Sequence, residues 1–136
     1  MDWIDWTNRE VVMEAVKKNG RALELAPVFQ TDREVVMEAV KQYGRALQHA
    51  SNELKNDREI VIEAVKESGH ALFYASNELK NDREVVMEAV KQSGHALFYA
   101  SNELQTDREV VMKAVKKSGC ALKYVPIFPI HSYKYN

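Results

Sequence analysis

Hydrophobic and polar residues follow the same order five times along the 136-residue chain, at a spacing of about 25 residues. Each unit opens with Arg-Glu-(Val/Ile)-Val after an Asn or Asp, and a glycine follows 12 residues after that Asn or Asp. The five glycines are the only ones in the chain: Gly20, Gly44, Gly69, Gly94 and Gly119. Such a repeat is typical of a solenoid, in which stacked helical units share one continuous core.

The first part of each unit has the period of an amphipathic α-helix. In the second unit, the Val, Met, Ala and Tyr side chains between residues 35 and 43 fill an arc of about 200° on a helical wheel. Charged and amide side chains fill the rest. So wide an apolar arc exceeds the stripe that a single contact needs. It predicts a helix that packs on two sides, against its partner helix and against neighbouring units.

The sequence also marks the ends of this helix. A polar residue followed three positions later by Glu predicts a capping box at each start. The pairs are Thr7/Glu10, Thr31/Glu34, Asn56/Glu59, Asn81/Glu84 and Thr106/Glu109. The helix is expected to end at the glycine, in the left-handed C′ conformation. This assigns a structural role to Gly44, Gly69, Gly94 and Gly119.

A second, shorter helix is predicted after each glycine, over about residues 70–79 in the third unit. Ala and Leu side chains form its apolar face. The Ser-Asn-Glu-Leu stretch either ends this helix or begins a tight turn, in α or 3₁₀ conformation. The prediction is an all-α solenoid with a right-handed-type superhelix, in one domain over residues 1–136. Its five helix-turn-helix repeats cover about residues 7–30, 31–55, 56–80, 81–105 and 106–128, and 129–136 form a tail.

The terminal repeats differ from the middle ones, as the caps of a solenoid do. Pro27 and Pro126 stand where the middle repeats have Ser, and proline is expected to stop the second helix early or bend the chain. Trp3 and Trp6 are expected to cover the N-terminal face. The tail is expected either to cover the C-terminal face or to be loosely held.

One arginine per repeat falls inside the apolar arc: Arg9, Arg33, Arg58, Arg83 and Arg108. Such a row would suit an anionic partner. The favoured interpretation is structural, with each stem packed between repeats and each guanidinium paired with an acid or carbonyl of the adjacent repeat. A net charge of −1 argues against an unpaired basic ladder.

The composition excludes several classes of protein. With 46% hydrophobic and 29% charged residues, the chain can form a real core, but it has no basic stripe of the kind that nucleic-acid binders carry. Its single cysteine, Cys120, permits no intrachain disulfide. Residues 1–6 do not have the basic segment and long apolar segment of a signal peptide, and no apolar run approaches ~20 residues. We expect a cytoplasmic protein, with secretion by a signal-less route left open.

The repeat resembles a known family. Its unit, Asp-Arg-Glu-Val-Val-x-x-Ala-Val-Lys-x-x-Gly-x-Ala-Leu-x-x-Ala-Ser-x-Glu-Leu, is matched most closely at 57–79 and 82–104. This pattern is similar to a bacterial, viral and protist repeat family catalogued as a domain of unknown function, DUF4116. The resemblance covers about residues 8–125. It implies a helical repeat module often found in larger proteins, with no catalytic residues and no defined ligand.

No catalytic constellation is visible. The sequence has no Gly-rich phosphate loop, no Gly-x-Ser-x-Gly and no His-Glu-x-x-His. Cys120 occupies a position that the other repeats fill with Arg or His, which argues against a nucleophile. His70 and His95 would lie ~8–10 Å apart on stacked helices, too far to share a metal ion directly. We therefore expect no enzyme, no metal and no cofactor.

The residues that vary between repeats are the candidates for binding a partner. The central repeats carry His, Phe and Asn on the face of the second helix away from the core, at His70, Phe73, Asn77, His95, Phe98 and Asn102. An exposed aromatic pair would anchor a peptide or protein. Alternatively, the two Phe rings pack on each other between repeats, or duplication copied them, because segments 57–81 and 82–106 differ at only five positions.

The sequence as a whole favours a non-enzymatic scaffold that binds a protein or peptide. Two alternatives stay open. One is single-stranded nucleic-acid binding along the repeats, although Glu24 and the net charge argue against it. The other is a structural spacer within a larger protein. We expect no membrane partner, and a monomer or a weak end-to-end oligomer.

Overall fold

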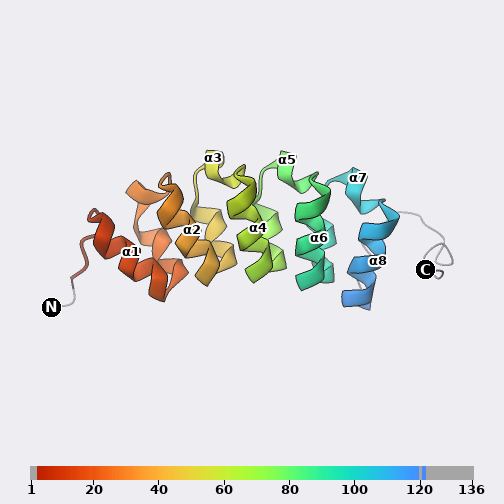
Figure 1. Cartoon of the computed structure of the whole chain (residues 1–136), viewed down its shortest axis with the longest axis horizontal. Coiled ribbons are helices and arrows are strands. Elements are labelled where there is room, and N and C mark those ends of the chain that lie inside the picture. Colours follow the sequence, from red (N-terminus) through yellow and green to blue (C-terminus); the bar gives the residue numbers. More distant parts are fainter. Residues whose placement is uncertain (1–2, 120, 122–136) are drawn as a thin grey trace.

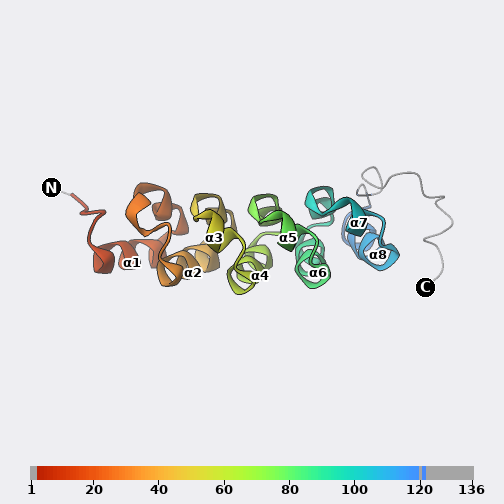
Figure 2. The same ribbon diagram turned by 90° about the horizontal axis from the view of Figure 1, so that it is seen from above.

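The computed structural model describes residues 3–119 and 121, and these form two layers of short helices (Figure 1). One layer contains α1 (Arg9–Lys18), α2 (Arg33–Gln42), α4 (Arg58–Glu67), α6 (Arg83–Gln92) and α8 (Arg108–Lys117). The other contains the 3₁₀ helices η1 (Gly20–Leu25), η3 (Gly44–His49), η4 (Gly69–Tyr74) and η5 (Gly94–Tyr99). Within each layer, every helix packs against its counterpart in the next repeat, and Figure 2 shows the two rows from above. The predicted all-α solenoid is confirmed.

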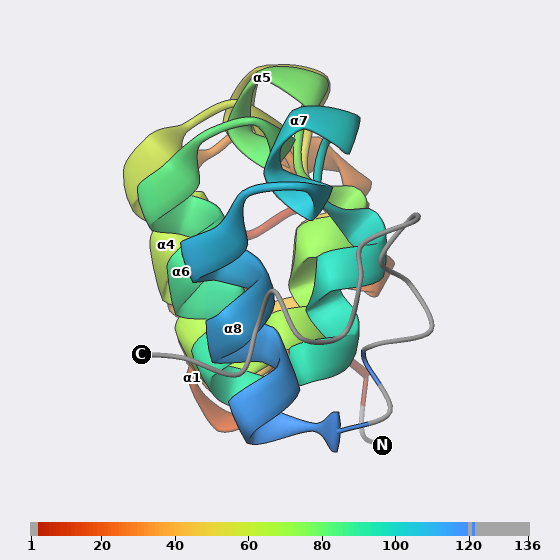
Figure 3. The same ribbon diagram turned by 90° about the vertical axis from the view of Figure 1, so that its right-hand side faces the viewer.

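A third set of helices lies along one edge of the stack, as the end-on view of Figure 3 shows. These are the single turns α3 (Asn52–Lys55), α5 (Asn77–Lys80) and α7 (Asn102–Gln105). The second helix predicted over about 70–79 is therefore divided into two elements, and the Ser-Asn-Glu-Leu stretch does not end it but begins a separate helical turn. The chain leaves the 3₁₀ helix at Ala75, which has φ −72° and ψ 160°. Ser76 then caps α5 by accepting a hydrogen bond from the Leu79 N–H at 3.2 Å.

The break at Ala75 has a physical cause in the contact between repeats. The backbone N–H of Ser76 donates to the Lys55 carbonyl of the preceding repeat at 3.0 Å, so it is not available to continue the helix. Ser76 Oγ also donates to Asn56 Oδ1 at 2.6 Å. Serine side chains compete in this way with helical hydrogen bonding. The Ser-Asn-Glu-Leu stretch thus joins neighbouring repeats along the edge.

The terminal repeats agree with the predictions in part. In the first repeat η1 ends at Leu25, and Pro27 occupies the first position of a separate short helix, η2 (Pro27–Phe29), as proline's fixed φ favours. Trp6 packs against the core, as expected. The prediction for Trp3 was wrong, because 75% of its surface is exposed. Pro126 and the tail at 129–136 lie outside the described residues.

The long α-helices begin one residue later than the capping boxes predicted. The N-cap residues are Asn8, Asp32, Asp57, Asp82 and Asp107. Asp82 is typical: its carboxylate accepts hydrogen bonds from the N–H groups of Glu84 and Val85 at 3.1 and 3.2 Å. The Asp thus caps the helix, and Glu84, at the second helical position, forms an ion pair with the preceding repeat instead.

The core runs without interruption along the stack. In α4, Ile60, Val61, Ala64 and Val65 are fully buried, which confirms burial on more than one side of the helix. Leu72 closes the core from the η layer and is also fully buried. Burial of each such Val, Ile or Leu side chain contributes about 1.5–3 kcal/mol, so packing between repeats holds together helices that are too short to be stable alone.

The glycines do not serve the purpose predicted for them. No glycine among Gly20, Gly44, Gly69, Gly94 and Gly119 has the left-handed conformation, so this prediction was wrong. Gly69 is needed because the next repeat comes very close. A Cβ atom on Gly69 would lie 2.5 Å from the Ala89 carbonyl oxygen, well inside contact distance, and the same conflict occurs at Gly20, Gly44 and Gly94. Glycine therefore sets how closely α- and η-helices of adjacent repeats approach.

We predict that Gly69→Ala lowers the free energy of unfolding by about 2–3 kcal/mol, because backbone must move to admit the methyl group. The measurement is urea unfolding followed by circular dichroism. Gly119→Ala is the matched control: no described atom would lie within 4 Å of the added methyl group, so a change within about 0.5 kcal/mol is expected. Equal losses in both variants would contradict the role of close approach.

Candidate partner-binding site

The two candidate phenylalanines lie on the exposed side of the η layer. Phe73 belongs to η4 and Phe98 to η5, and 53% and 56% of their surfaces are exposed. Their sequence neighbours Leu72 and Leu97 are fully buried on the core side. Each 3₁₀ helix thus presents one large apolar side chain to the core and another to solvent.

A tyrosine links the two phenylalanines. The Tyr99 ring lies edge-on to Phe73, with ring centroids 5.3 Å apart, and edge-on to Phe98 at 5.6 Å. Tyr99 is half-buried and packs against the core. Such T-shaped contacts fix the relative orientation of rings. We call Phe73, Tyr74, Phe98 and Tyr99 the aromatic strip.

The strip is flanked by groups that are mostly neutral or shielded. Tyr74 contacts the Phe73 ring at 5.1 Å, and Lys80 Nζ lies 5.5 Å from the centroid of that ring. His70 lies 6.0 Å from Tyr99. Partial burial, with smaller effects of nearby Arg45 and His95, lowers the pKa of His70 below its ordinary value of 6.5. His70 is therefore mainly neutral at pH 7, which extends the uncharged character of the strip.

The six predicted residues do not form one row. His70, Phe73, His95 and Phe98 lie on η4 and η5, whereas Asn77 and Asn102 are the first residues of the edge helices α5 and α7. The prediction placed the His, Phe and Asn residues on one face of a helix over about 70–79. The break at Ala75 separates the asparagines from the aromatic residues.

Sequence reasoning missed Tyr74, Tyr99 and Lys80. The observed 3₁₀ helix has three residues per turn and aligns positions i and i+3. This spacing places His70 and Phe73 on one side of η4 and leaves the tyrosine to face a neighbouring repeat, as Tyr99 does towards Phe73. A recurring Phe-Tyr pair after Gly-His-Ala-Leu was the available signal.

The aromatic strip does not continue into the first two repeats. At matched positions η1 and η3 carry Arg21, Glu24, Arg45 and Gln48. Glu24 lies 4.0 Å from His49 Nε2, and the Arg21 guanidinium lies over the Tyr43 ring at 4.7 Å. Hence the positions that match His70 and Phe73 are polar in the first two repeats, and the aromatic strip is confined to the third and fourth.

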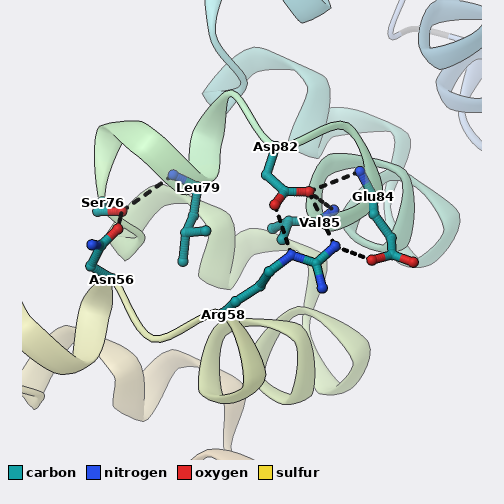
Figure 4. Close-up of polar contacts among 7 residues, drawn as sticks. All are labelled: Asn56, Arg58, Ser76, Leu79, Asp82, Glu84 and Val85. Atoms are coloured by element: carbon teal, nitrogen blue, oxygen red, sulfur yellow. Dashed lines mark hydrogen bonds and ion pairs between the residues drawn. The ribbon is translucent and has the colours of Figure 1, made fainter.

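The arginine row is structural, as the favoured interpretation predicted. Arg58 Nε donates to Asp82 Oδ2 at 2.8 Å, and its Nη2 forms a second ion pair with Glu84 (Figure 4). Arg9, Arg33 and Arg83 form the same two pairs with the next repeat, at Asp32/Glu34, Asp57/Glu59 and Asp107/Glu109. These four guanidinium groups bind the acids that start the following α-helix. They therefore join repeats and are not an open basic row.

The pairing also changes the acid–base behaviour of the carboxylates. The hydrogen bond from Arg58 holds the pKa of Asp82 below its ordinary value of 3.8, against the opposing effect of partial burial. Asp32 and Asp57 have lowered pKa values for the same reason. The charged form of each carboxylate is thus stabilised twice, by the arginine and by the helix N–H groups that it caps.

Comparison with known families gives a clear match. The model of the domain of unknown function DUF4116 matches four overlapping stretches, residues 8–55, 32–80, 57–105 and 82–128. No curated protein and no solved structure matches the chain. Within the part of the chain that the structure describes, no helix is long and apolar enough to cross a membrane.

We predict that Asp82→Ala lowers the free energy of unfolding by about 1 kcal/mol or more, because α6 loses its N-cap. Asp82→Asn should cost less, since its amide oxygen can still accept the capping hydrogen bond, as Asn8 does from the Val11 N–H at 3.2 Å. Chemical unfolding of both variants measures the difference. If the Asn and Ala variants are equally destabilised, capping is not the main role of this residue.

We predict that acid weakens the fold through these carboxylates. Because their folded-state pKa values are lowered, their stabilising contribution is complete above the unfolded-state value of about 4 and is lost as the pH falls through the lower folded-state pKa. Urea unfolding from pH 7 down to the acid range should show this loss. In Arg58→Gln the loss should be smaller, because Asp82 no longer has its main partner. If the free energy of unfolding falls equally with pH in the wild type and in Arg58→Gln, the ion pairs of the arginine row do not cause the acid sensitivity.

Proposed function

The chain belongs to the DUF4116 family of helical repeat proteins, and we propose that it is a non-enzymatic scaffold that binds a protein or peptide through the aromatic strip. The observation that carries the proposal is the exposure of Phe73 and Phe98, each above one half, in successive repeats. Contiguous exposed aromatic groups are typical of protein-binding surfaces.

The strip has the rigidity that a binding platform needs. Phe73 is held between Tyr74 and Tyr99, and Tyr99 is anchored in the core. Side chains that are already ordered lose little conformational entropy when a partner binds. Aromatic residues are also the commonest energetic anchors of interfaces. A partner segment that lies across η4 and η5 would contact rings of both repeats.

The largely uncharged surroundings favour a peptide or protein over a polyanion. His70 is mainly neutral at pH 7. Single-stranded nucleic acids need a basic groove as well as stacking rings, and here Glu78 and Glu103 are exposed on the neighbouring edge helices. Nucleic-acid binding, the second candidate, rests on the proximity of Lys80 to Phe73. A steep fall in affinity with added salt would identify it.

We predict that the double change Phe73→Ser and Phe98→Ser removes specific partners, at least tenfold by abundance. The measurement is affinity capture from cells of the source organism with quantitative mass spectrometry. Both side chains are largely exposed, so the melting temperature should change little. The matched control is Leu25→Ser with Val28→Ser, which removes two other exposed apolar side chains (56% and 63% exposed) from the first repeat.

The two double variants separate the possible outcomes. Loss of partners in the phenylalanine variant alone supports the aromatic strip. If every specific partner is retained, the strip does not bind them and the proposal is wrong. If wild-type protein captures no specific partner, the spacer interpretation takes its place.

A further inference from the structure

The α layer carries a second candidate surface, in the groove between α6 and α8. Met87 and Met112, which pack partly against the core, give the groove its apolar part. Lys91, Arg108, Lys113 and Lys116 line it together with one acid, Glu109. Four cations against one acid give the lining residues a formal charge of +3, and Lys91 also pairs with Glu88 at 3.2 Å.

The equivalent groove one repeat earlier has the opposite sign. Between α4 and α6, Arg58 and Lys66 are outnumbered by four acids, Glu59, Glu63, Glu84 and Glu88. Two cations against four acids give −2, with Ile62 in the apolar part. Lys113 accounts for two of the five charges in this difference, because the same position holds Glu14, Glu38, Glu63 and Glu88 in the other four repeats. The rest arises because the two grooves are not lined by fully matching residues. Arg58, Glu59 and Glu63 of α4 have no counterpart in the lining of the α6–α8 groove, and Arg108 and Lys116 of α8 have none in that of the α4–α6 groove.

The position of Lys113 in its helix does not by itself call for a cation. Lys116 and Lys117 lie in the last turn of α8, where cations favourably meet the helix dipole, but Lys113 lies in the middle of the helix. In α6 the equivalent residue, Glu88, pairs with Lys91 at 3.2 Å. In α8 the same spacing sets Lys113 beside Lys116, and like charges at this spacing destabilise a helix. Lys113 also lies four residues after Glu109, a spacing that favours opposite charges, so the helix tolerates the lysine.

We infer that the α6–α8 groove binds a short acidic peptide segment of a partner protein, with an apolar side chain of that segment placed against Met87 and Met112. Carboxylates of the segment would face Lys91, Lys113 and Lys116. Methionine side chains adapt readily to different apolar partners, and charge complementarity would orient the segment. The adjoining acidic groove disfavours a long polyanion or an anionic membrane, each of which would extend over it.

This surface is independent of the aromatic strip. The groove lies on the α layer and the strip on the η layer, and these are separate rows of the stack (Figure 2). One scaffold would then hold two partners at once. The inference does not rest on the function proposed for the strip, and changes in one layer leave the other intact.

The test is fluorescence anisotropy with a labelled peptide of about ten residues, in which glutamates flank two leucines. We expect Lys113→Glu to weaken binding about tenfold, because it places a like charge against the peptide. This variant restores the residue type of the other four repeats, so it should fold normally. The matched control, Lys66→Glu in the α4–α6 groove, should change the affinity less than about twofold.

Two further arms make the test decisive. Glu88→Lys places a lysine on α6 at the position equivalent to Lys113 and changes the formal charge of the α4–α6 groove lining from −2 to 0, so it should add weak peptide binding at a second site. A peptide with Gln for Glu should not bind. The inference is overturned if Lys113→Glu binds as tightly as the wild type. It is also overturned if anionic phospholipid vesicles or a single-stranded oligonucleotide bind more tightly than the peptide and lose binding in the same variant.

Discussion

The stack depends on the close approach of backbones where one repeat meets the next. The Ala89 carbonyl lies so near to Gly69 that only a hydrogen atom fits between them. This contact brings the first turn of η4 against the end of α6, and it lets the Val and Ala side chains of successive helices form one core. With helices of ten residues or fewer, local hydrogen bonding alone would not keep the chain folded. The other contacts between repeats therefore depend on this close spacing of the backbones.

Those other contacts gather at the edge of the stack where the one-turn helices lead into the α-helices (Figure 4). There each of the four paired arginines joins the two acids at the start of the next α-helix, and the Ser76–Asn56 and Ser101–Asn81 pairs each join a one-turn helix to the repeat before it. The ion pairs are partly exposed, and exposed pairs contribute little to stability individually. Their value lies in register: a carboxylate that caps a helix and also binds the preceding repeat fixes where that helix begins.

Much of this could be predicted from the sequence because it is periodic. Five repeats, a helix buried on two sides and the pairing of arginines between repeats all followed from side chains that recur at a constant spacing. The errors concern backbone geometry. Left-handed conformation and close approach both require glycine, so the pattern could not tell them apart at Gly69. The break at Ala75 depends on a hydrogen bond between Ser76 and Lys55 in different repeats, which no local pattern contains.

The candidate site was predictable only in part for the same reason. The exposure of Phe73 and Phe98 shows that the two rings are not buried between repeats. The sequence alone could not predict this exposure, because it depends on which face of a 3₁₀ helix points outward. Tyr99 escaped notice because its role is defined by a ring in the neighbouring repeat. Positions that repeat without change build the stack, while those that vary give each layer its own surface.

The ion pairs of the arginine row all run in one direction along the array, from each repeat to the next. The arginine of each of the first four repeats forms an ion pair with the next repeat. From the second repeat on, the helix-capping Asp accepts this arginine from the repeat before it. The first repeat has the uncharged residue Asn8 at this capping position. A middle unit could be duplicated in place and find matching neighbours on both sides, whereas a copy of the first unit placed inside the array would leave the preceding arginine with one acid fewer. Growth by insertion of internal units is thus compatible with the chemistry of every junction, and the near-identity of the third and fourth repeats is what such growth would leave behind.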